Sequence, residues 1–380
     1  MDFSGKSKLL VVDDSAFMRK LISDFFVGNL KVEVVGTARN GKDALMKIKK
    51  LQPNVVTMDI EMPELNGLDA LNEIMTVCPV PVVMLSSTTQ HGAENALTAI
   101  EYGAVDFVTK PSGTISLDLH KIQDELVRKV EQAALVPISK LKKPSRKKQQ
   151  EPTLILNNKK IEPFNKGRIT SSAISTAETK KQRVEWSRTS KKVVLIGTST
   201  GGPRALQAVI TKIPKNIQAP ILIVQHMPAG FTKSLATRLD QLSEIVVKEA
   251  EQGDILQNGV AYIAPGGYHL KLKKLGTSFG IVLDNHESPR SGHRPSVDVM
   301  FEDASQFNEF DKIAVIMTGM GYDGSKGLKV LKNSGNVMAI AESAETCIVY
   351  GMPKAAVETQ LVDEVADIDD IAQIIMKYLP

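Results

Sequence analysis

Short apolar runs alternate with segments of helical periodicity along the first 130 residues of the chain. The runs are rich in Val, Ile and Leu and indicate buried β-strands, and apolar residues three or four positions apart indicate amphipathic helices. The predicted strands are Lys8–Val12, Val32–Thr37, Val55–Met58, Val80–Leu85 and Val105–Val108, and the predicted helices run through Phe17, Leu21, Ile22 and Phe25 and cover Gly41–Lys50 and Leu117–Gln132. Strands that alternate with helices predict a parallel sheet with helices on both faces.

The same alternation returns in residues 191–380. Strands are predicted at 193–197, 220–225, 245–249, 260–264 and 313–318, with shorter ones at 269–274, 280–283 and 337–341. Helices are predicted at 203–212, 231–243, 297–308, 324–333, 353–358 and 368–378. This pattern predicts a second α/β domain, mainly parallel and Rossmann-like, with a hairpin insertion around Gly266–Asn285.

Residues 131–190 have a different composition, with the basic run KLKKPSRKKQQ, scattered Pro, Asn, Ser and Thr, and little apolar periodicity. Residues 137–192 contain 16 Lys/Arg and 4 Asp/Glu, a net charge of +12; the chain total is +4, so the rest carries −8. The basicity therefore belongs to one segment, and we do not expect a nucleic-acid-binding protein. The basic run could contact an acidic receptor or a membrane surface, but its composition favours a solvated, flexible linker between domains at 1–130 and 191–380.

Several other classes of protein are disfavoured by the sequence. The polar stretch Met1–Lys8 is not a signal peptide, and none of the apolar runs is long enough to cross a bilayer. The two cysteines, Cys78 and Cys347, form neither a disulfide framework nor a metal-binding pattern. We expect a cytoplasmic protein that is not itself embedded in a membrane.

Five polar residues stand where predicted strands of the first domain end: Asp13, Asp14, Asp59, Ser86 and Lys110. The carboxyl ends of parallel strands meet at one edge of a sheet. Carboxylates gathered there require a cation, and hard oxygen ligands suit Mg²⁺, which retains an open position for a phosphoryl oxygen. The Asp59 carboxylate could then attack phosphorus, with the Lys110 ammonium and the Ser86 hydroxyl contacting the phosphoryl oxygens.

Residues 1–130 resemble the flavodoxin-like receiver domain of a two-component response regulator, in the pieces VVDDS, VTMDIEMPELNGLDAL, PVVMLSS and GAVDFVTKP. The resemblance implies that Asp59 accepts a phosphoryl group from a histidine kinase. It also implies that Asp13 and Asp14 bind Mg²⁺ together with Asp59 and the carbonyl of Glu61.

Three further positions follow from the same resemblance. The Lys110–Pro111 peptide is expected to be cis, and Phe107 stands where the family has its aromatic switch residue. The hydroxyl contact could be Ser86 or Ser87; the spacing from Pro81 favours Ser86.

The second domain contains a candidate nucleophile in the stretch KKVVLIGTSTGGPRAL, residues 191–206. A buried strand is followed by a glycine-rich turn, and Pro203 suits the first position of a helix. Ser199 would therefore lie beside unpaired backbone N–H groups at a helix N-terminus, which favours a developing oxyanion. The match to G-x-S-x-G is weak alone, and a glycine-rich turn that binds an anion or only joins strand to helix is the alternative.

A serine nucleophile needs a base, and the base needs an orienting acid. Of the four histidines in this domain, only His226 follows an apolar strand as Ser199 does; the others are His269, His286 and His293. Asp323 is the candidate acid because it lies after the buried strand of AVIMTGMGYDG, in a turn with Gly319, Gly321 and Gly324 that could donate N–H groups to an oxyanion. Its competitors are Asp298, which suits the first turn of a helix, and Asp284, which lies in a polar loop.

The order Ser199, His226, Asp323 differs from the order Ser, Asp, His of α/β-hydrolases. The second domain resembles the catalytic domain of the CheB family of chemotaxis protein-glutamate methylesterases, in IGTSTGGPRAL, VQHMPAGFT, YIAPGGYHL, GHRPSVDVMF and MTGMGYDGSKGL. The resemblance implies a Ser199–His226–Asp323 triad and an oxyanion contact from the backbone N–H of Met320. Thr198 is a mild departure, since many members have a smaller residue there.

The resemblance implies a phosphorylation-activated hydrolase that removes γ-methyl esters from chemoreceptor glutamates and deamidates receptor glutamines, giving adaptation in chemotaxis. A chemotaxis histidine kinase would be the phosphoryl donor, and the catalytic domain would need no cofactor. The unphosphorylated receiver is expected to cover the Ser199 edge. Two other hypotheses are a general serine esterase with a receiver attached and a non-enzymatic module that binds receptors.

Overall fold

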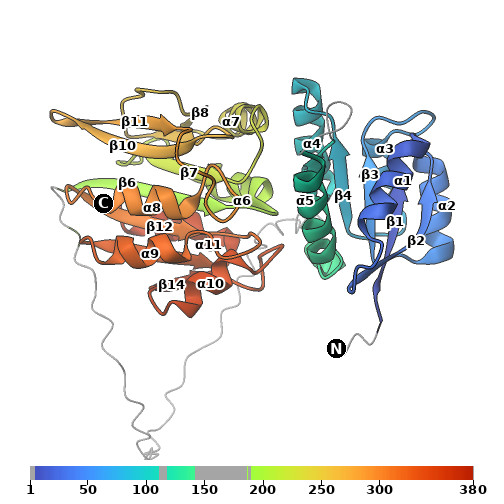
Figure 1. Cartoon of the computed structure of the whole chain (residues 1–380). Coiled ribbons are helices and arrows are strands. Elements are labelled where there is room, and N and C mark those ends of the chain that lie inside the picture. The colour runs from blue at the N-terminus through green and yellow to red at the C-terminus, as the bar shows by residue number, and fades with distance from the viewer. Residues whose placement is uncertain (1–4, 111–117, 142–185, 187–189, 380) are drawn as a thin grey trace, which may run out of the picture. The chain divides into compact units, whose positions relative to one another are not determined.

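A computed structural model describes residues 5–110, 118–141, 186 and 190–379 of the chain. The N-terminal domain alternates strands and helices, as predicted (Figure 1). Its elements are β1 (Ser7–Val12), α1 (Ala16–Phe25), β2 (Val32–Ala38), α2 (Gly41–Leu51), β3 (Val55–Asp59), α3 (Gly67–Val77), β4 (Val82–Ser86), α4 (Gln90–Tyr102), β5 (Asp106–Thr109) and α5 (Asp118–Ala133). Helices α3 and α4 were not among the predicted elements, and each begins at a side-chain cap, Asn66 and Thr89 respectively.

The five strands of this domain form one parallel sheet in the order β2-β1-β3-β4-β5, which is the flavodoxin-like order. Alternate residues of β1 face opposite sides: Leu10 and Val12 pack with α2, α3 and α4, while Leu9 and Val11 pack with α1 and α5. Both faces of the sheet are therefore buried, which explains why its strands are continuous apolar runs.

The C-terminal domain has the same layered construction. Its elements are β6 (Lys191–Thr198), α6 (Gly202–Ile210), β7 (Ile221–Gln225), α7 (Phe231–Leu242), β8 (Val246–Glu249), β9 (Val260–Ile263), β10 (His269–Leu275), β11 (Ser278–Asp284), α8 (Val297–Ala304), β12 (Phe310–Ile316), α9 (Ser325–Lys332), β13 (Val337–Glu342), α10 (Met352–Glu358), β14 (Glu364–Ala366) and α11 (Ile368–Lys377). The predicted hairpin is confirmed as the antiparallel pair β10–β11, and β14 is a short strand that was not predicted.

Seven strands of this domain form a wholly parallel sheet in the order β14-β13-β12-β6-β7-β9-β8. The chain adds strands on one side of β6 from β7 onward and on the other side from β12 onward. The topological switch point therefore lies between β6 and β12, where open α/β sheets bind ligands at the carboxyl ends of their strands.

The ends of several elements differ from the sequence prediction. Strand β12 runs from Phe310 to Ile316, earlier than the predicted 313–318, and helix α8 ends at Ala304 instead of 308. Helix α5 continues to Ala133, past the predicted domain boundary at 130, and a short 3-10 helix follows at Ile138–Lys140. Most of the predicted linker lies outside the described residues.

The described residues of both α/β domains belong to one compact unit. Helix α4 packs against α6 and α7, and the rings of Phe107 in β5 and Phe231 in α7 stack with centroids 4.9 Å apart. Lys140 also donates to the carbonyls of Ala344 and Cys347, at 2.6 and 2.8 Å. The apolar core on the α4 side of the first sheet is continuous with the core on the α6 and α7 side of the second.

A close backbone approach fixes the packing of α8 against α9 and generates a prediction on stability. A Cβ on Gly327 would lie 2.7 Å from the carbonyl oxygen of Asp298 and 2.8 Å from its Cα. Gly327→Ala should therefore destabilise the C-terminal domain by about 1–3 kcal/mol, because overpacking forces the helix backbones apart. The exposed Lys329 on the same helix is the control: Lys329→Ala should leave the unfolding midpoint in urea nearly unchanged. A Gly327→Ala variant as stable as wild type would contradict the prediction.

Candidate active site

Ser199 lies in the turn that joins β6 to α6, at the switch point of the seven-stranded sheet. Its backbone N–H donates to the carbonyl of Thr318 at 3.0 Å, which ties the turn to the end of β12. Gly201 has a φ of +77°, a left-handed conformation that favours glycine, and helix α6 begins directly after it. The predicted order of strand, glycine-rich turn and helix is confirmed, and the helix begins at Gly202, one residue before Pro203.

A buried amide holds this turn in place. The side chain of Gln225, at the end of β7, donates to the carbonyl of Ser199 at 3.0 Å and accepts from the Thr198 hydroxyl at 2.6 Å. A Cβ on Gly202 would lie 1.8 Å from the Gln225 amide oxygen, so this position has no room for a side chain. The Gln225 amide therefore accounts for the second glycine of the pair.

His226 and Asp323 are brought together although they are almost one hundred residues apart. His226 follows β7, and its Nε2 lies 2.8 Å from Oδ2 of Asp323, in the loop after β12. Both side chains are buried, at 5% and 2% exposure. The other ring nitrogen, Nδ1, is buried without a hydrogen-bond partner among the described residues. The common Ser-His-Asp arrangement has the acid on Nδ1; here the acid is on Nε2, and Nδ1 is the nitrogen left for a hydroxyl.

The Asp323 carboxylate lies against the N-terminus of helix α8. It accepts from the Ser296 hydroxyl at 2.9 Å and from the backbone N–H groups of Val297 and Asp298 at 2.7 and 3.0 Å. Burial by itself would raise the pKa of Asp323, but the His226 hydrogen bond and charge and these N–H donors outweigh it and hold the pKa below its usual range. Asp323 is therefore a fixed anion beside His226.

Asp298 supports this arrangement from the first turn of α8, as the sequence predicted for its position. Its Oδ1 accepts from the backbone N–H groups of Gly324 and Gly327 at 2.9 and 2.6 Å. Burial raises the pKa of Asp298 to about 6, and the charge of Asp323 adds to the rise. Asp298 thus anchors the turn that carries Asp323 and does not contact His226.

One cavity of about 420 Å³ joins the predicted residues: Ser199, His226 and Met320 all line it. The three strands that precede them, β6, β7 and β12, are neighbours in the sheet. His293 lines the same cavity, stacked on the ring of His226. Of the remaining histidines, His269 is fully buried with Nε2 3.2 Å from the carbonyl oxygen of Ser288, and His286 is exposed.

Residues of the N-terminal domain form part of the wall of this cavity. Helix α5 contributes Asp124, Glu125, Arg128 and Lys129. The hydroxyl of Thr200, next to Ser199, donates to the Asp106 carboxylate of β5 at 2.7 Å. The N-terminal domain therefore contacts the residue adjacent to the candidate nucleophile.

The acidic cluster predicted in the N-terminal domain is present. Carboxylate oxygens of Asp13, Asp14 and Asp59 lie within 4.8 Å of one another. Lys110 Nζ lies 2.7 Å from Asp59 and 2.9 Å from Asp13. Burial raises the pKa of Asp59 to about 6 although Lys110 opposes the rise, and the Asp13 charge adds to it. Crowded, hard oxygen donors of this kind fit a divalent cation such as Mg²⁺.

The two hydroxyls that could contact a phosphoryl group, those of Ser86 and Ser87, differ in their surroundings. Ser86 is fully buried and donates to the carbonyl of Gly92 at 2.7 Å, so a phosphoryl contact would require it to release that bond. Ser87 Oγ lies 3.4 Å from the carboxylate of Glu61. Phe107 is buried. The predicted cis peptide at Lys110–Pro111 lies outside the described residues, because Pro111 does.

Sequence reasoning missed several parts of this site. The sequence pattern indicates no role for Ser296 or for Gln225, which stands next to His226, and it predicts only a loop position for His293. All but Gln225 lie within the segment GHRPSVDVMF, whose density of polar residues around a helix start was the available signal.

The described residues include no helix long and apolar enough to span a membrane.

Family models match both domains. The response regulator receiver domain matches residues 9–120, and the CheB methylesterase domain matches residues 194–375. Three relatives share the description protein-glutamate methylesterase/protein-glutamine glutaminase. They are from Halalkalibacterium halodurans (53% identical, 98% of both chains), Bacillus subtilis (49%, 96% of both) and Methanococcus maripaludis (43%, 98% of both).

Solved structures resemble each domain separately. The CheB methylesterase catalytic domain of Thermotoga maritima is 46% identical and covers 50% of this chain and 98% of its own, with a TM-score of 0.48. The response regulator domain of Thermotoga maritima CheB is 47% identical and covers 35% and 99%, with a TM-score of 0.33. With identity near one half over almost the whole length, the chain belongs to the family of protein-glutamate methylesterases/protein-glutamine glutaminases, hydrolases that join a receiver domain to a CheB methylesterase domain.

Proposed function

We propose that this hydrolase acts on glutamate γ-methyl esters of chemoreceptors through a Ser199–His226–Asp323 triad. The observation that carries the proposal is the buried 2.8 Å contact between His226 and Asp323 in the wall of the cavity that Ser199 also lines. Ser199 and His226 line this cavity, and the segments that carry the proposed nucleophile, base and acid follow β6, β7 and β12, which are neighbours in the sheet. The expected substrate is a glutamate ester on a receptor's cytoplasmic helices, and the expected location of the enzyme is the cytoplasm.

We assign a role to each ring nitrogen of His226, and the contact with Asp323 supports this assignment. In the proposed tautomer, Nε2–H donates a hydrogen bond to the Asp323 carboxylate, and Nδ1 keeps a free lone pair. Nδ1 takes the proton of the Ser199 hydroxyl as its oxygen attacks the ester carbonyl, and the anion of Asp323 stabilises the imidazolium that forms. The same imidazolium then protonates the departing methoxide, so that methanol leaves and a glutamyl–serine ester remains.

Water completes the cycle by the reverse path. His226 removes a proton from water, hydroxide attacks the glutamyl ester, and Ser199 leaves with the proton returned by His226. Deamidation of a receptor glutamine follows the same steps with ammonia as the leaving group. The backbone N–H of Met320, in the cavity wall, is the proposed donor to the oxyanion. We expect no cofactor in this domain.

The receiver domain supplies the proposed control. Asp59 is the proposed phosphoryl acceptor from a chemotaxis histidine kinase. Asp13, Asp14, Asp59 and the carbonyl of Glu61 would hold Mg²⁺, which would neutralise charge on the phosphoryl group. Lys110 and the hydroxyl of Ser86, or of Ser87, would contact its oxygens.

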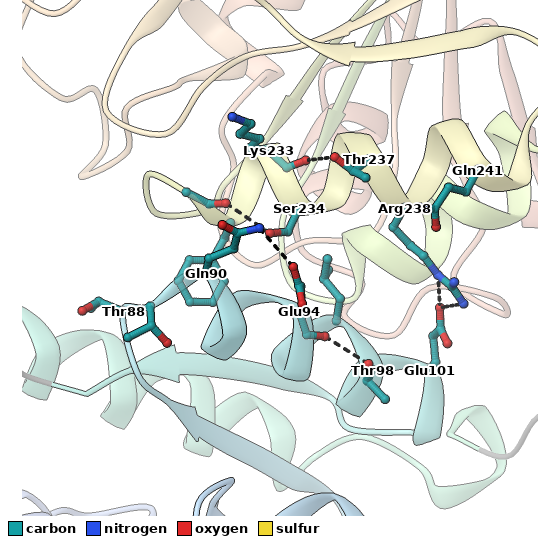
Figure 2. Close-up of a pocket in the computed structure, with 14 residues that line it drawn as sticks. Thr88, Gln90, Glu94, Thr98, Glu101, Lys233, Ser234, Thr237, Arg238 and Gln241 are labelled. Carbon is teal, nitrogen blue, oxygen red and sulfur yellow. Dashed lines mark hydrogen bonds and ion pairs between the residues drawn. The ribbon is translucent and has the colours of Figure 1, made fainter.

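Contacts between α4 and α7 support a resting state in which the receiver covers the cavity that Ser199 lines. Figure 2 shows Arg238 of α7 reaching Glu101 of α4, where Nε and Nη2 lie 2.8 and 2.7 Å from the same carboxylate oxygen. A cavity of about 600 Å³ separates the remaining polar side chains of the two helices. The interface is therefore held by this ion pair and is hollow beside it, as expected of a contact that phosphorylation must release.

Ser199→Ala should lower methanol release from methylated receptor membranes by about 10⁴-fold or more, because the nucleophile is lost. Asp323→Asn should cost about 10⁴-fold, since it removes the anion that fixes the His226 tautomer. Asp284→Asn, at the competing acid, is the matched control and should retain activity. Full activity in Ser199→Ala would contradict the triad, and equal hydrolysis of small soluble esters would favour a general esterase.

Mg²⁺ should stabilise the receiver domain. At a concentration ten times the dissociation constant, binding adds about 1.4 kcal/mol to the free energy of unfolding, by linkage. The unfolding midpoint of the full chain should therefore rise by a few degrees with Mg²⁺ in a thermal scan. Asp13→Asn should abolish the rise, whereas Glu73→Gln, at an exposed acid of α3, should preserve it. A rise that survives Asp13→Asn would place the cation elsewhere.

Arg238→Ala should raise the methylesterase activity of the unphosphorylated chain by at most about fivefold, because a partly exposed ion pair contributes about 0.2–1 kcal/mol. The activity of the phosphorylated chain should not change. Lys273→Ala, at an exposed lysine of β10 that does not line this cavity, is the control. Restored repression in the double variant Glu101→Arg, Arg238→Glu would show that the pair itself acts. Unchanged basal activity in Arg238→Ala would remove this pair from the control mechanism.

A further inference from the structure

A second histidine lies flat against the proposed base. The rings of His226 and His293 stack with centroids 3.8 Å apart and planes inclined by 6°. The pair lies in the wall of the cavity that Ser199 lines. Because His226 is bound by Asp323 along one ring edge, a partner on its face restricts the remaining freedom, which is rotation of the ring plane about the Nε2 contact.

A tight turn presents His293 to the base. Arg290 and His293 exchange backbone hydrogen bonds of 2.9 Å in both directions, and the two residues between them, Ser291 and Gly292, have φ of 53° and 83°. Two left-handed residues between a mutually bonded pair define a two-residue hairpin turn of the primed type, a conformation that a non-glycine residue such as Ser291 rarely adopts.

Ion pairs attach this turn to the body of the domain. Arg290 is bonded to Glu287 at 2.7 Å and to Glu302 of helix α8. On the other side of His293, Arg294 donates to the carbonyls of Asn285 and Glu287 at 2.7 and 3.1 Å. Arg290 and Arg294 are therefore both held in place, and this fixes the position and orientation of the His293 ring between them.

The stacked rings cannot both carry charge. Burial lowers the pKa of His293 to about 3, and repulsion by a charged His226 contributes, with Arg128 and Lys129 in the same sense and Asp323 opposed. His293 is thus a neutral ring at physiological pH. A neutral π face against a transient imidazolium is a favourable arrangement, whereas two imidazolium rings would repel. The charged side chains that line the cavity are Asp124, Glu125, Arg128, Lys129 and Arg294.

We propose that His293 is a positioning residue for His226: its flat ring keeps Nε2 on Asp323 and Nδ1 towards the cavity, and it excludes water from one face of the base. This inference rests on the proposed triad and deepens it. The function belongs to the shape and neutrality of the ring and not to its nitrogens, so any flat aromatic side chain should serve.

The test compares His293→Phe with His293→Ala in the full chain treated with Mg²⁺ and a small phosphoryl donor. Methanol release from methylated receptor membranes gives kcat/KM across a range of pH. His293→Ala should lose about 10²-fold, the effect of a misplaced catalytic group. The acidic limb of the kcat/KM profile of His293→Ala should move to higher pH. In that variant water reaches the exposed face of the His226 ring and favours the imidazolium in the free enzyme. His293→Phe should retain most of the activity and the wild-type limb.

Controls separate positioning from folding and from failure of the triad. His286→Ala, at an exposed histidine of the same loop, should match wild type in rate and in unfolding midpoint. Equal losses in Phe and Ala variants would overturn the proposal by assigning the role to the ring nitrogens, as would a uniform loss at all pH values with a lowered unfolding midpoint. Activity that does not depend on Ser199 would instead contradict the triad itself.

Discussion

The C-terminal domain is organised around a buried carboxylate. Asp323 has almost no contact with solvent, and an ionised carboxylate in such a place is stable only if its lone pairs are occupied. The donors come from separate parts of the chain: the ring of His226 after β7, and Ser296, Val297 and Asp298 at the start of α8. Satisfying one anion therefore fixes the end of β12, the start of α8 and the ring of the proposed base at the same time.

In both domains the candidate site lies at the carboxyl edge of the sheet, but the helices that follow the strands begin with different kinds of cap. In the receiver, the helices after β1, β2, β3 and β4 begin with a capping side chain, from Ser15, Asn40, Asn66 and Thr89. In the methylesterase domain, the helices α6, α7 and α9 begin at Gly201, Gly230 and Gly324, which have positive φ and provide no capping side chain. Glycine caps leave backbone N–H groups for other acceptors, and Asp298 and Asp323 take those at the start of α9. An oxyanion site benefits in the same way, because backbone N–H groups that no side chain caps can bind the anion.

Local patterns were sufficient for most of the fold because both sheets are parallel and buried on both faces. Each strand is an apolar run, and each strand end carries its polar residue into the next turn, so Asp59, Ser199 and His226 could be located by position alone. The partners that hold these residues could not. Gln225 binds the Ser199 turn across a sheet, and His293 reaches His226 from a loop whose turn depends on Ser291 adopting a left-handed conformation. Such contacts depend on tertiary packing, which the periodicity of the sequence does not reveal. Strand β14, three residues long, was missed for the same reason.

Strand β5 and the residue that follows it, Lys110, have contacts at both proposed centres. Asp106, at its start, accepts from Thr200 beside the nucleophile, and Phe107 stacks on Phe231 of the methylesterase domain. Three residues further on, Lys110 is paired with Asp59 and Asp13. A phosphoryl group on Asp59 would compete for Lys110, and any adjustment of β5 would act directly on the Asp106 and Phe107 contacts. Moving the resting state from 1:99 to 99:1 requires about 5.5 kcal/mol, more than one surface ion pair provides. The buried contacts of β5, rather than the Arg238–Glu101 pair, must therefore carry most of the proposed switch.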